Sequence, residues 1–238
     1  MASQPLDTTH LPSTEELPSS DETPVDNEEQ NLLPNLLLFL LKHLWADRMD
    51  WFFGVDMAVY HTAGISHRVP VVPDAFLSLG VDRKNRKRDG KFRKSYAIWE
   101  EEDIVPILTL EMVSHQYNDE YEDKLDLYAK LGVLYYIIYN PEYWQRHSHQ
   151  PLEIYKLEEG VYRRQIGEPF WMPEVGLGIG RTRQLLGGIE RETLRWFDAQ
   201  GRMYPSPDEE LVQARQRAER LAEYLRSLGL DPDNLPEI

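Results

Sequence analysis

The chain has 238 residues, of which 41% are hydrophobic, and a formal net charge of −15. This length and apolar fraction suffice for one sizeable soluble domain with appendages. Because the sequence contains no cysteine, disulfides, zinc–thiolate sites, iron–sulfur clusters and cysteine nucleophiles are excluded.

The N-terminal segment, residues 1–30, holds about half of the net negative charge. It carries eight carboxylates and no Lys or Arg, and it is rich in Pro, Ser and Thr. Such a segment has little to bury, which predicts a disordered acidic tail. The longest apolar run, residues 36–41, is too short for a membrane span, and no basic leader precedes it. We therefore expect a cytoplasmic protein without membrane contact.

A folded domain is expected over residues 31–204. Leucines at helical spacing predict an amphipathic helix from Leu32 to Trp45. Three strand-like runs follow, at Val55–Tyr60, Val71–Leu79 and Val105–Val113. The period then changes to that of a helix over residues 119–131, with Asn118 as its N-cap and Gly132 at its end.

The second half of the domain is predicted to complete the sheet. Val133–Tyr139 has the pattern of a buried strand, and Leu152–Leu157 and Val161–Gln165 form a hairpin around Glu158-Glu159-Gly160. Further short strands extend to Tyr204. This order predicts an α/β (α+β) fold with a mixed sheet, flanking helices and a helical crossover between neighbouring strands.

Residues 205–238 are expected to form an appended helix. Ser206, Pro207 and Glu209 match a capped helix start. Apolar residues then recur at alternating spacings of three and four, which indicates a short coiled-coil seam: Leu211, Ala214, Ala218, Leu221, Leu225 and Leu228. Two interpretations remain open, a homodimer through this helix and docking of the helix on its own domain.

Two carboxylates interrupt apolar strand patterns. Asp74 follows Pro73 at the start of one predicted strand, and Glu111 lies near the end of the next. A carboxylate in such a place needs a partner, a proton or a metal, because its desolvation is otherwise costly. Two acids from adjacent strand ends form a hard-oxygen site suited to Mg²⁺ or Mn²⁺. For either residue alone, solvent exposure or a salt bridge is the commoner explanation.

Lys124 lies within the apolar face of the predicted helix 119–131, between Tyr121, Leu125 and Tyr128. A lone lysine in this position usually extends its amine to the surface. Here the acid-bearing strand directly precedes the helix, so two acids, one amine and a metal are expected to converge. Phosphodiester cleavage requires such a cluster.

These residues also carry a family resemblance. The strings VPDAFLSLG, PILTLEMVS and DKLDLYAKLGVLYYIIYNP resemble the Uma2 (DUF820) family of the PD-(D/E)XK nuclease superfamily, over about Leu32 to Tyr204. The resemblance implies a restriction-endonuclease-like core, a divalent metal and DNA as substrate. It puts Asp74 and Glu111 in the two acidic positions of the superfamily motif.

The chain departs from that motif where the superfamily has its lysine, because Val113 stands two residues after Glu111. The resemblance implies that the lysine has moved to the following helix, where Lys124 lies. The backbone carbonyl of Val113 is expected as a further metal ligand. The family's Ser-Pro-Ser-Thr segment is also replaced, by Ser114-His115-Gln116-Tyr117. Both departures leave open a fold kept for binding after catalysis was lost.

One dense basic segment lies between the two acidic strands. Its cations are Arg83, Lys84, Arg86, Lys87, Arg88, Lys91, Arg93 and Lys94. It is a candidate for contacting DNA phosphates at the mouth of the site, and equally a solvated hairpin that offsets the acidic surface. The acidic tail is a possible competitor of DNA for it. His147 and His149 have no further ligand nearby in sequence, so no zinc site is expected there.

The sequence thus leads to two hypotheses. The first is a Mg²⁺- or Mn²⁺-dependent DNA endonuclease in which Asp74 and Glu111 bind metal and Lys124 is the catalytic cation. The second is a catalytically inactive nuclease fold that acts as a DNA-binding or protein-interaction module.

Overall fold

The computed structural model describes residues 11–13, 28–63, 66–113, 120–147, 149–186 and 188–232. Its helices are α1 (Glu28–Leu44), α2 (Asp123–Leu131) and α3 (Pro207–Ser227), with short 3-10 helices at Arg86–Arg88, Ile98–Glu100 and Trp144–His147. In this part of the chain, no helix has the length and apolar character needed to cross a membrane.

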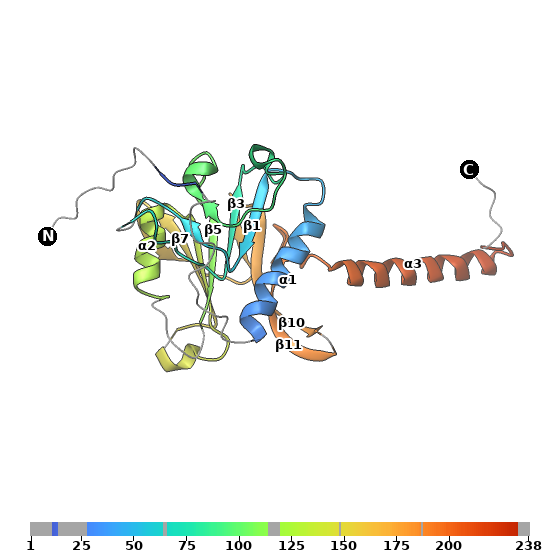
Figure 1. Ribbon diagram of the computed structural model, residues 1–238. Helices are drawn as coiled ribbons and strands as arrows, with labels where there is room; N and C mark the ends of the chain where they lie inside the picture. Colours follow the sequence, from blue (N-terminus) through green and yellow to red (C-terminus); the bar gives the residue numbers. More distant parts are fainter. Residues whose placement is uncertain are drawn as a thin grey trace.

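The central sheet has the strand order β1-β3-β5-β6-β7-β8 (Figure 1). Its strands are β1 (Trp51–Val55), β3 (Ala75–Leu79), β5 (Leu108–Met112), β6 (Tyr135–Tyr139), β7 (Leu152–Glu158) and β8 (Val161–Arg164). Only the β5–β6 pair within this sheet is parallel, and α2 connects those two strands. The predicted mixed α/β fold with a helical crossover is confirmed.

Two smaller sheets complete the domain. The predicted additional C-terminal strands form a sheet in the order β11-β10-β9, with β9 at Phe170–Met172, β10 at Leu177–Leu186 and β11 at Ile189–Phe197. The parallel pair of β2 (Val59–Tyr60) and β4 (Tyr96–Ala97) forms the other.

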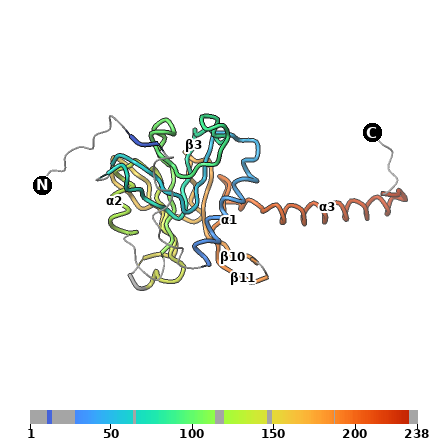
Figure 2. The backbone as a smooth tube through the Cα atoms, in the orientation of Figure 1, coloured from blue at the N-terminus to red at the C-terminus, as the bar shows by residue number. Residues whose placement is uncertain are grey.

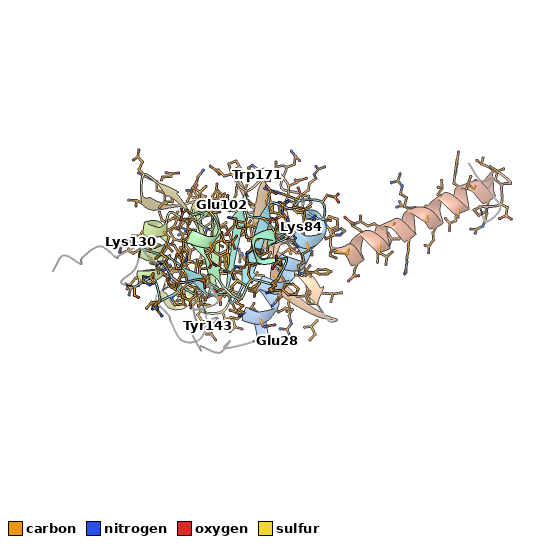
Figure 3. The ribbon with its side chains drawn as sticks, turned by 45° about the horizontal axis from the view of Figure 1, so that its top comes forward. Glu28, Lys84, Glu102, Lys130, Tyr143 and Trp171 are labelled. Carbon is orange, nitrogen blue, oxygen red and sulfur yellow. The ribbon has the colours of Figure 1, made fainter. Side chains whose placement is uncertain are left out.

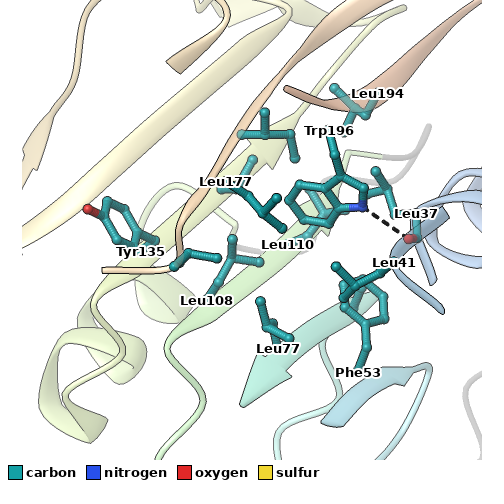
Figure 4. Packing of buried hydrophobic residues seen from close by; sticks show 14 of the residues in the cluster. Leu37, Leu41, Phe53, Leu77, Leu108, Leu110, Tyr135, Leu177, Leu194 and Trp196 are labelled. Atoms are coloured by element: carbon teal, nitrogen blue, oxygen red, sulfur yellow. Dashed lines mark hydrogen bonds between the residues drawn. The ribbon is translucent and has the colours of Figure 1, made fainter. Parts of the chain in front are cut away.

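Alternating side chains give the central sheet two buried faces. One face packs against α1 and the β9–β11 sheet, which lie side by side (Figure 2). Trp196 of β11 joins them, because its ring meets Phe53 edge-on and its Nε1 donates to the Leu37 carbonyl at 3.0 Å (Figure 4). The opposite face, with Phe76 and Tyr136, is covered by Tyr128 and its neighbours on α2.

Helices α1 and α2 do not begin at the residues predicted from the sequence. Helix α1 begins at Glu28, inside the predicted tail, because its first turn is held by tertiary contacts. Glu28 pairs with Arg191 of β11 at 3.4 Å, and Gln30 donates to the Met112 carbonyl at 3.5 Å. Helix α2 begins at Asp123 rather than at residue 119, and the expected cap Asn118 lies outside the described residues.

The C-terminal helix has the predicted start. Ser206 and Glu209 form a reciprocal capping box, and Pro207 opens the helix. No side chain of α3 is buried, and the helix projects away from the sheets (Figure 1). The alternative that α3 docks on its own domain is therefore wrong.

Candidate active site

Strand register places the two acidic residues opposite each other. Ala75 of β3 pairs with Leu110 of β5, so Asp74, one residue before β3, lies across from Glu111. Both belong to the face of the sheet that α2 covers, since Phe76 and Ile138 of that face contact the core beneath α2. Like charges directly opposite on adjacent strands repel each other.

Glu111 is buried and fully engaged by α2. Its side chain is 2% exposed. Its Oε2 accepts from Lys124 Nζ at 2.9 Å, and its Oε1 accepts from the Tyr128 hydroxyl at 2.6 Å. Burial raises the pKa of Glu111, whereas Lys124 and Tyr128 act in the opposite direction, and the net shift is upward.

Asp74 is held by the main chain of β5. Its Oδ2 accepts from the N–H of Met112 at 2.5 Å. Burial, followed by repulsion from Glu111, raises the pKa of Asp74 well above its ordinary value. The acid pair is therefore electrostatically unfavourable in the folded protein unless a proton or a cation is shared.

Lys124 points into the site. Its side chain is 20% exposed. Burial alone would lower the pKa of Lys124, but Glu111, Glu120 and Asp74 raise it by more. The amine is therefore a retained positive charge between acids, and the three residues expected from the sequence come together.

Two further residues belong to this cluster. Tyr128 was expected only as an apolar contact of α2, although its spacing of four residues from Lys124 puts both on one helical face. Glu120 is 3% exposed and raises the pKa of both Glu111 and Lys124. Its main-chain carbonyl accepts from the buried Tyr136 hydroxyl at 2.7 Å. The strand–helix connection therefore adds a third carboxylate to the electrostatics of the site.

The Uma2 family model, described as "Putative restriction endonuclease", matches residues 21–186. The chain belongs to the Uma2 family. No curated protein matches it. Among solved structures, one similar chain is described as a putative nuclease belonging to DUF820 from Anabaena variabilis ATCC 29413. It shares 12% identity, and the match covers 63% of this chain and 74% of that one with a TM-score of 0.45.

In this Uma2 chain, the main-chain group beside the acids belongs to Met112 rather than Val113. The N–H and C=O of a strand residue point to the same neighbouring strand. The N–H of Val113 donates to the Tyr139 carbonyl of β6 at 2.9 Å, whereas that of Met112 donates to Asp74. The carbonyl expected from Val113 therefore faces away from Asp74.

The donor set of the Uma2 site fits a hard divalent cation. In the described part of the chain, no group of three or more His, Cys, Asp or Glu side chains is arranged to hold a metal ion. Mg²⁺, however, commonly keeps most of its water and binds through one or two carboxylates. Asp74 and Glu111 supply such a pair. A cation there would share Glu111 with Lys124 and Tyr128.

The basic segment does not lie at this site. Arg83 and its neighbours follow the far end of β3, where Gly80 donates to the Asp50 carbonyl at 2.6 Å. Asp74 precedes the other end of β3, whose length of five residues corresponds to about 17 Å. The first residues of the segment therefore lie at the opposite end of β3 from Asp74, and the contact of the segment with DNA stays a prediction.

Several cations of the segment pair with nearby acids. Arg86 contacts Asp82 at 3.1 Å, Lys87 contacts Glu102 at 2.8 Å, Arg88 contacts Glu100, and Arg93 contacts Glu101 at 2.6 Å. These pairs agree with the interpretation that the segment offsets acidic surface.

Part of the segment also lines a groove along β1, an outer strand of the central sheet. The groove has a volume of about 460 Å³, and its lining includes no acidic residue. Its basic lining residues are Lys42, Arg83, Lys84, Lys91 and Arg93. Phe92 at its rim is 99% exposed. Lys84 lies beside α1, on the side of the domain opposite Lys130 of α2 (Figure 3). The groove runs along β1 as far as Val55, which pairs with Ala75 next to Asp74.

Proposed function

We propose that this Uma2 protein is a metal-dependent endonuclease that hydrolyses phosphodiester bonds of DNA. The observation that carries the proposal is the convergence of Asp74, Glu111 and the Lys124 amine on one face of the sheet. A buried acid pair with raised pKa values and an adjacent cation is typical of a functional site. Membership of the Uma2 family, described as putative restriction endonucleases, supports the same reaction class.

Each residue has a distinct role in the proposal. Asp74 and Glu111 hold Mg²⁺ or Mn²⁺. When bound, the cation polarises the phosphoryl oxygen and lowers the pKa of the attacking water. Lys124 orients that water and neutralises charge that develops on the phosphoryl group. Tyr128 fixes the Glu111 carboxylate.

The proposed substrate is DNA, held partly by basic residues away from the acids. Lys84, Lys91 and Arg83 line the basic groove, where phosphates meet cations and Phe92 offers an exposed aromatic ring. This contact is expected to weaken steeply with salt, because each phosphate contact releases counterions.

Plasmid cleavage by matched variants tests the proposal. Purified protein is incubated with supercoiled plasmid and labelled oligonucleotides in Mg²⁺ or Mn²⁺, with EDTA as the metal-free control. Asp74→Asn and Lys124→Met are expected to lower the cleavage rate by about 10² or more. Lys130→Met and Asp126→Asn, on the exposed side of α2, are expected to cleave like the wild type.

The outcomes separate the two hypotheses from the sequence. Cleavage that persists in Asp74→Asn and Lys124→Met would come from a contaminating nuclease. DNA binding without metal-dependent cleavage would favour the inactive binding module.

A further inference from the structure

A second polar cluster lies in the same row of the sheet as the acid pair. The register places Glu111 of β5 beside Ile138 of β6, and Ile138 beside Glu153 of β7. Residues 153 and 155 share a face, and Tyr155 packs in the core beneath α2, so Glu153 lies on the face that bears Glu111. Two strand spacings separate Glu153 from Glu111, which corresponds to about 10 Å.

Glu153 is buried and held in one orientation. Its side chain is 1% exposed. Its Oε1 accepts from the N–H of Gln150 at 2.9 Å, and its Oε2 accepts from the Tyr155 hydroxyl at 2.5 Å. Burying a carboxylate costs free energy of folding unless nearby cations compensate its charge.

A histidine and an arginine side chain, both more exposed, flank this carboxylate. His149 Nδ1 lies 3.4 Å and Arg164 NH1 lies 3.5 Å from Glu153 Oε1. The side chains are 29% and 48% exposed, so much of each faces solvent. Both distances exceed those of strong charge-assisted hydrogen bonds, and the guanidinium retains donors for an incoming anion.

The His149 ring also contacts the segment just before α2. It stacks on Tyr121 with ring centroids 3.6 Å apart and planes 9° from parallel. The Tyr121 hydroxyl in turn accepts from Asn140 Nδ2 at 3.2 Å. Tyr121 directly follows Glu120, so this cluster and the acid site share the same connection between β5 and α2.

We propose that His149 and Arg164, aligned by Glu153, bind a backbone phosphate of the nucleic-acid strand near the phosphate that is cut. The inference rests on the proposed function, because it assumes the same substrate. The cluster binds one strand along the row that runs from Asp74 to Glu153. The acid pair alone would repel the polyanion, and the Arg164 guanidinium, with the His149 ring close to the same carboxylate, supplies an attraction beside it. Since they meet a phosphate and no base edge, the contact is independent of sequence.

Binding measured without turnover tests the subsite. Fluorescein-labelled duplexes of two unrelated sequences are titrated with the full chain across a salt series, with Ca²⁺ in place of Mg²⁺, and a denaturing gel verifies that the strands stay intact. Arg164→Gln is expected to weaken binding several-fold on both duplexes and to reduce the salt slope by about one unit. Arg164→Lys should keep the slope, and His149→Gln should weaken binding less.

Arg163→Gln is the matched control. It removes the same charge from the adjacent residue of β8, whose side chain is 63% exposed and pairs with Glu158 at 3.1 Å. Its position in the strand directs it to the other face of the sheet. Thermal melts of all variants verify that each is folded.

Equal effects of Arg164→Gln and Arg163→Gln would overturn the subsite, even if the wild type cleaves DNA with metal. A specific Arg164 effect in a protein that never cleaves would support the subsite and overturn the proposed catalysis. A folded wild type that binds neither duplex would overturn both.

Discussion

At the scale of single residues, the site depends on how one buried carboxylate is compensated. Lys124 and Tyr128 both donate to Glu111, although burial leaves its pKa raised. Among the described residues Asp74 has no ion pair, and its pKa is raised well above normal by burial and by Glu111. The free protein therefore holds an unfavourable acid pair, which a divalent cation would relieve. Functional sites often reduce stability in this way.

Asp74→Asn is predicted to stabilise the free protein at neutral pH. In the wild type the folded-state pKa of Asp74 is raised above its unfolded value, so the folded state binds the proton more tightly. The contribution of Asp74 to the free energy of unfolding is therefore greatest at low pH. It is lost as pH rises from about 4 through the raised folded-state pKa. The variant lacks this loss, so its melting temperature should exceed that of the wild type increasingly as pH rises.

Thermal melts from pH 4 to 8 measure this difference, with exposed Asp126→Asn as the control. Added Mn²⁺ should raise the melting temperature of the wild type more than that of Asp74→Asn. Parallel pH curves for the wild type and Asp74→Asn would refute the assigned repulsion.

Tyr128→Phe is predicted to destabilise the fold by about 1.5–3 kcal/mol, because it removes a hydrogen bond to a charged group. Tyr162→Phe is a suitable control. Tyr162 is buried in the same cluster, but its hydroxyl donates to the neutral Val133 carbonyl at 2.7 Å. That loss should cost only about 0.5–1.5 kcal/mol. Urea unfolding of both variants measures the loss in free energy of unfolding. Equal losses would mean that the hydrogen bond from Tyr128 to Glu111 is no stronger than one to a neutral carbonyl.

At the scale of elements, the contacts between α3 and the rest of the described chain lie at its first turn. Buried Arg195 of β11 contacts Glu209 at 2.8 Å and the Tyr204 carbonyl at 2.7 Å, and His43 of α1 contacts Glu210 at 2.9 Å. Beyond this turn the helix leaves its apolar side chains in solvent; Leu221 is 58% exposed. A solvated helix of this pattern lacks the packing that usually stabilises helices.

We therefore predict that α3 mediates a homodimer through its coiled-coil seam. Leu221→Asp should shift the protein towards monomer, because it puts a charge in the apolar seam. Gln216→Asp adds the same charge on the opposite side of the helix and should leave the association unchanged. Sedimentation equilibrium of the three proteins measures the oligomeric state. A wild type that stays monomeric at high concentration would rule out the dimer.

At the scale of the whole molecule, charge is separated along the chain and across the fold. Asp74 precedes one end of β3 and the basic segment follows the other end, and the basic groove runs along the neighbouring strand β1 between these ends. Most of the predicted acidic tail, residues 1–10 and 14–27, lies outside the described residues. Residues 11–13 of the tail contact the domain near Trp99, whose Nε1 donates to the Pro12 carbonyl at 3.0 Å.

Deleting residues 1–27 removes six carboxylates and no Lys or Arg. DNA binding should tighten several-fold at low salt, because competition with phosphates for the basic groove is lost. The difference should vanish at high salt, where exposed charges are screened. Anisotropy titrations of the truncated and full chains measure it, beside a full-length control with the six acids changed to their amides. An unchanged affinity at low salt would end this hypothesis.

Local patterns were sufficient for much of the fold. The alternation around Glu111, the capping residues at Ser206 and the turn at Glu159-Gly160 depend on neighbours in sequence, and the structure has each as expected. Helix α1 extends past its predicted start because Arg191, far away in the chain, holds Glu28. The position of the basic segment between two acidic strands in sequence does not reveal which end of β3 its first residues follow.

By itself, the sequence determined the fold class and the family resemblance and selected Asp74, Glu111 and Lys124 as candidates, because periodicity and residue chemistry are local properties. Tertiary structure alone decided which groups meet. Strand register set Asp74 against Glu111 and aligned Glu153 in the same row, and helix packing brought Tyr128 to the buried carboxylate. The physical reason is that register and packing are set by long-range hydrogen bonds and burial, which no single stretch of chain encodes.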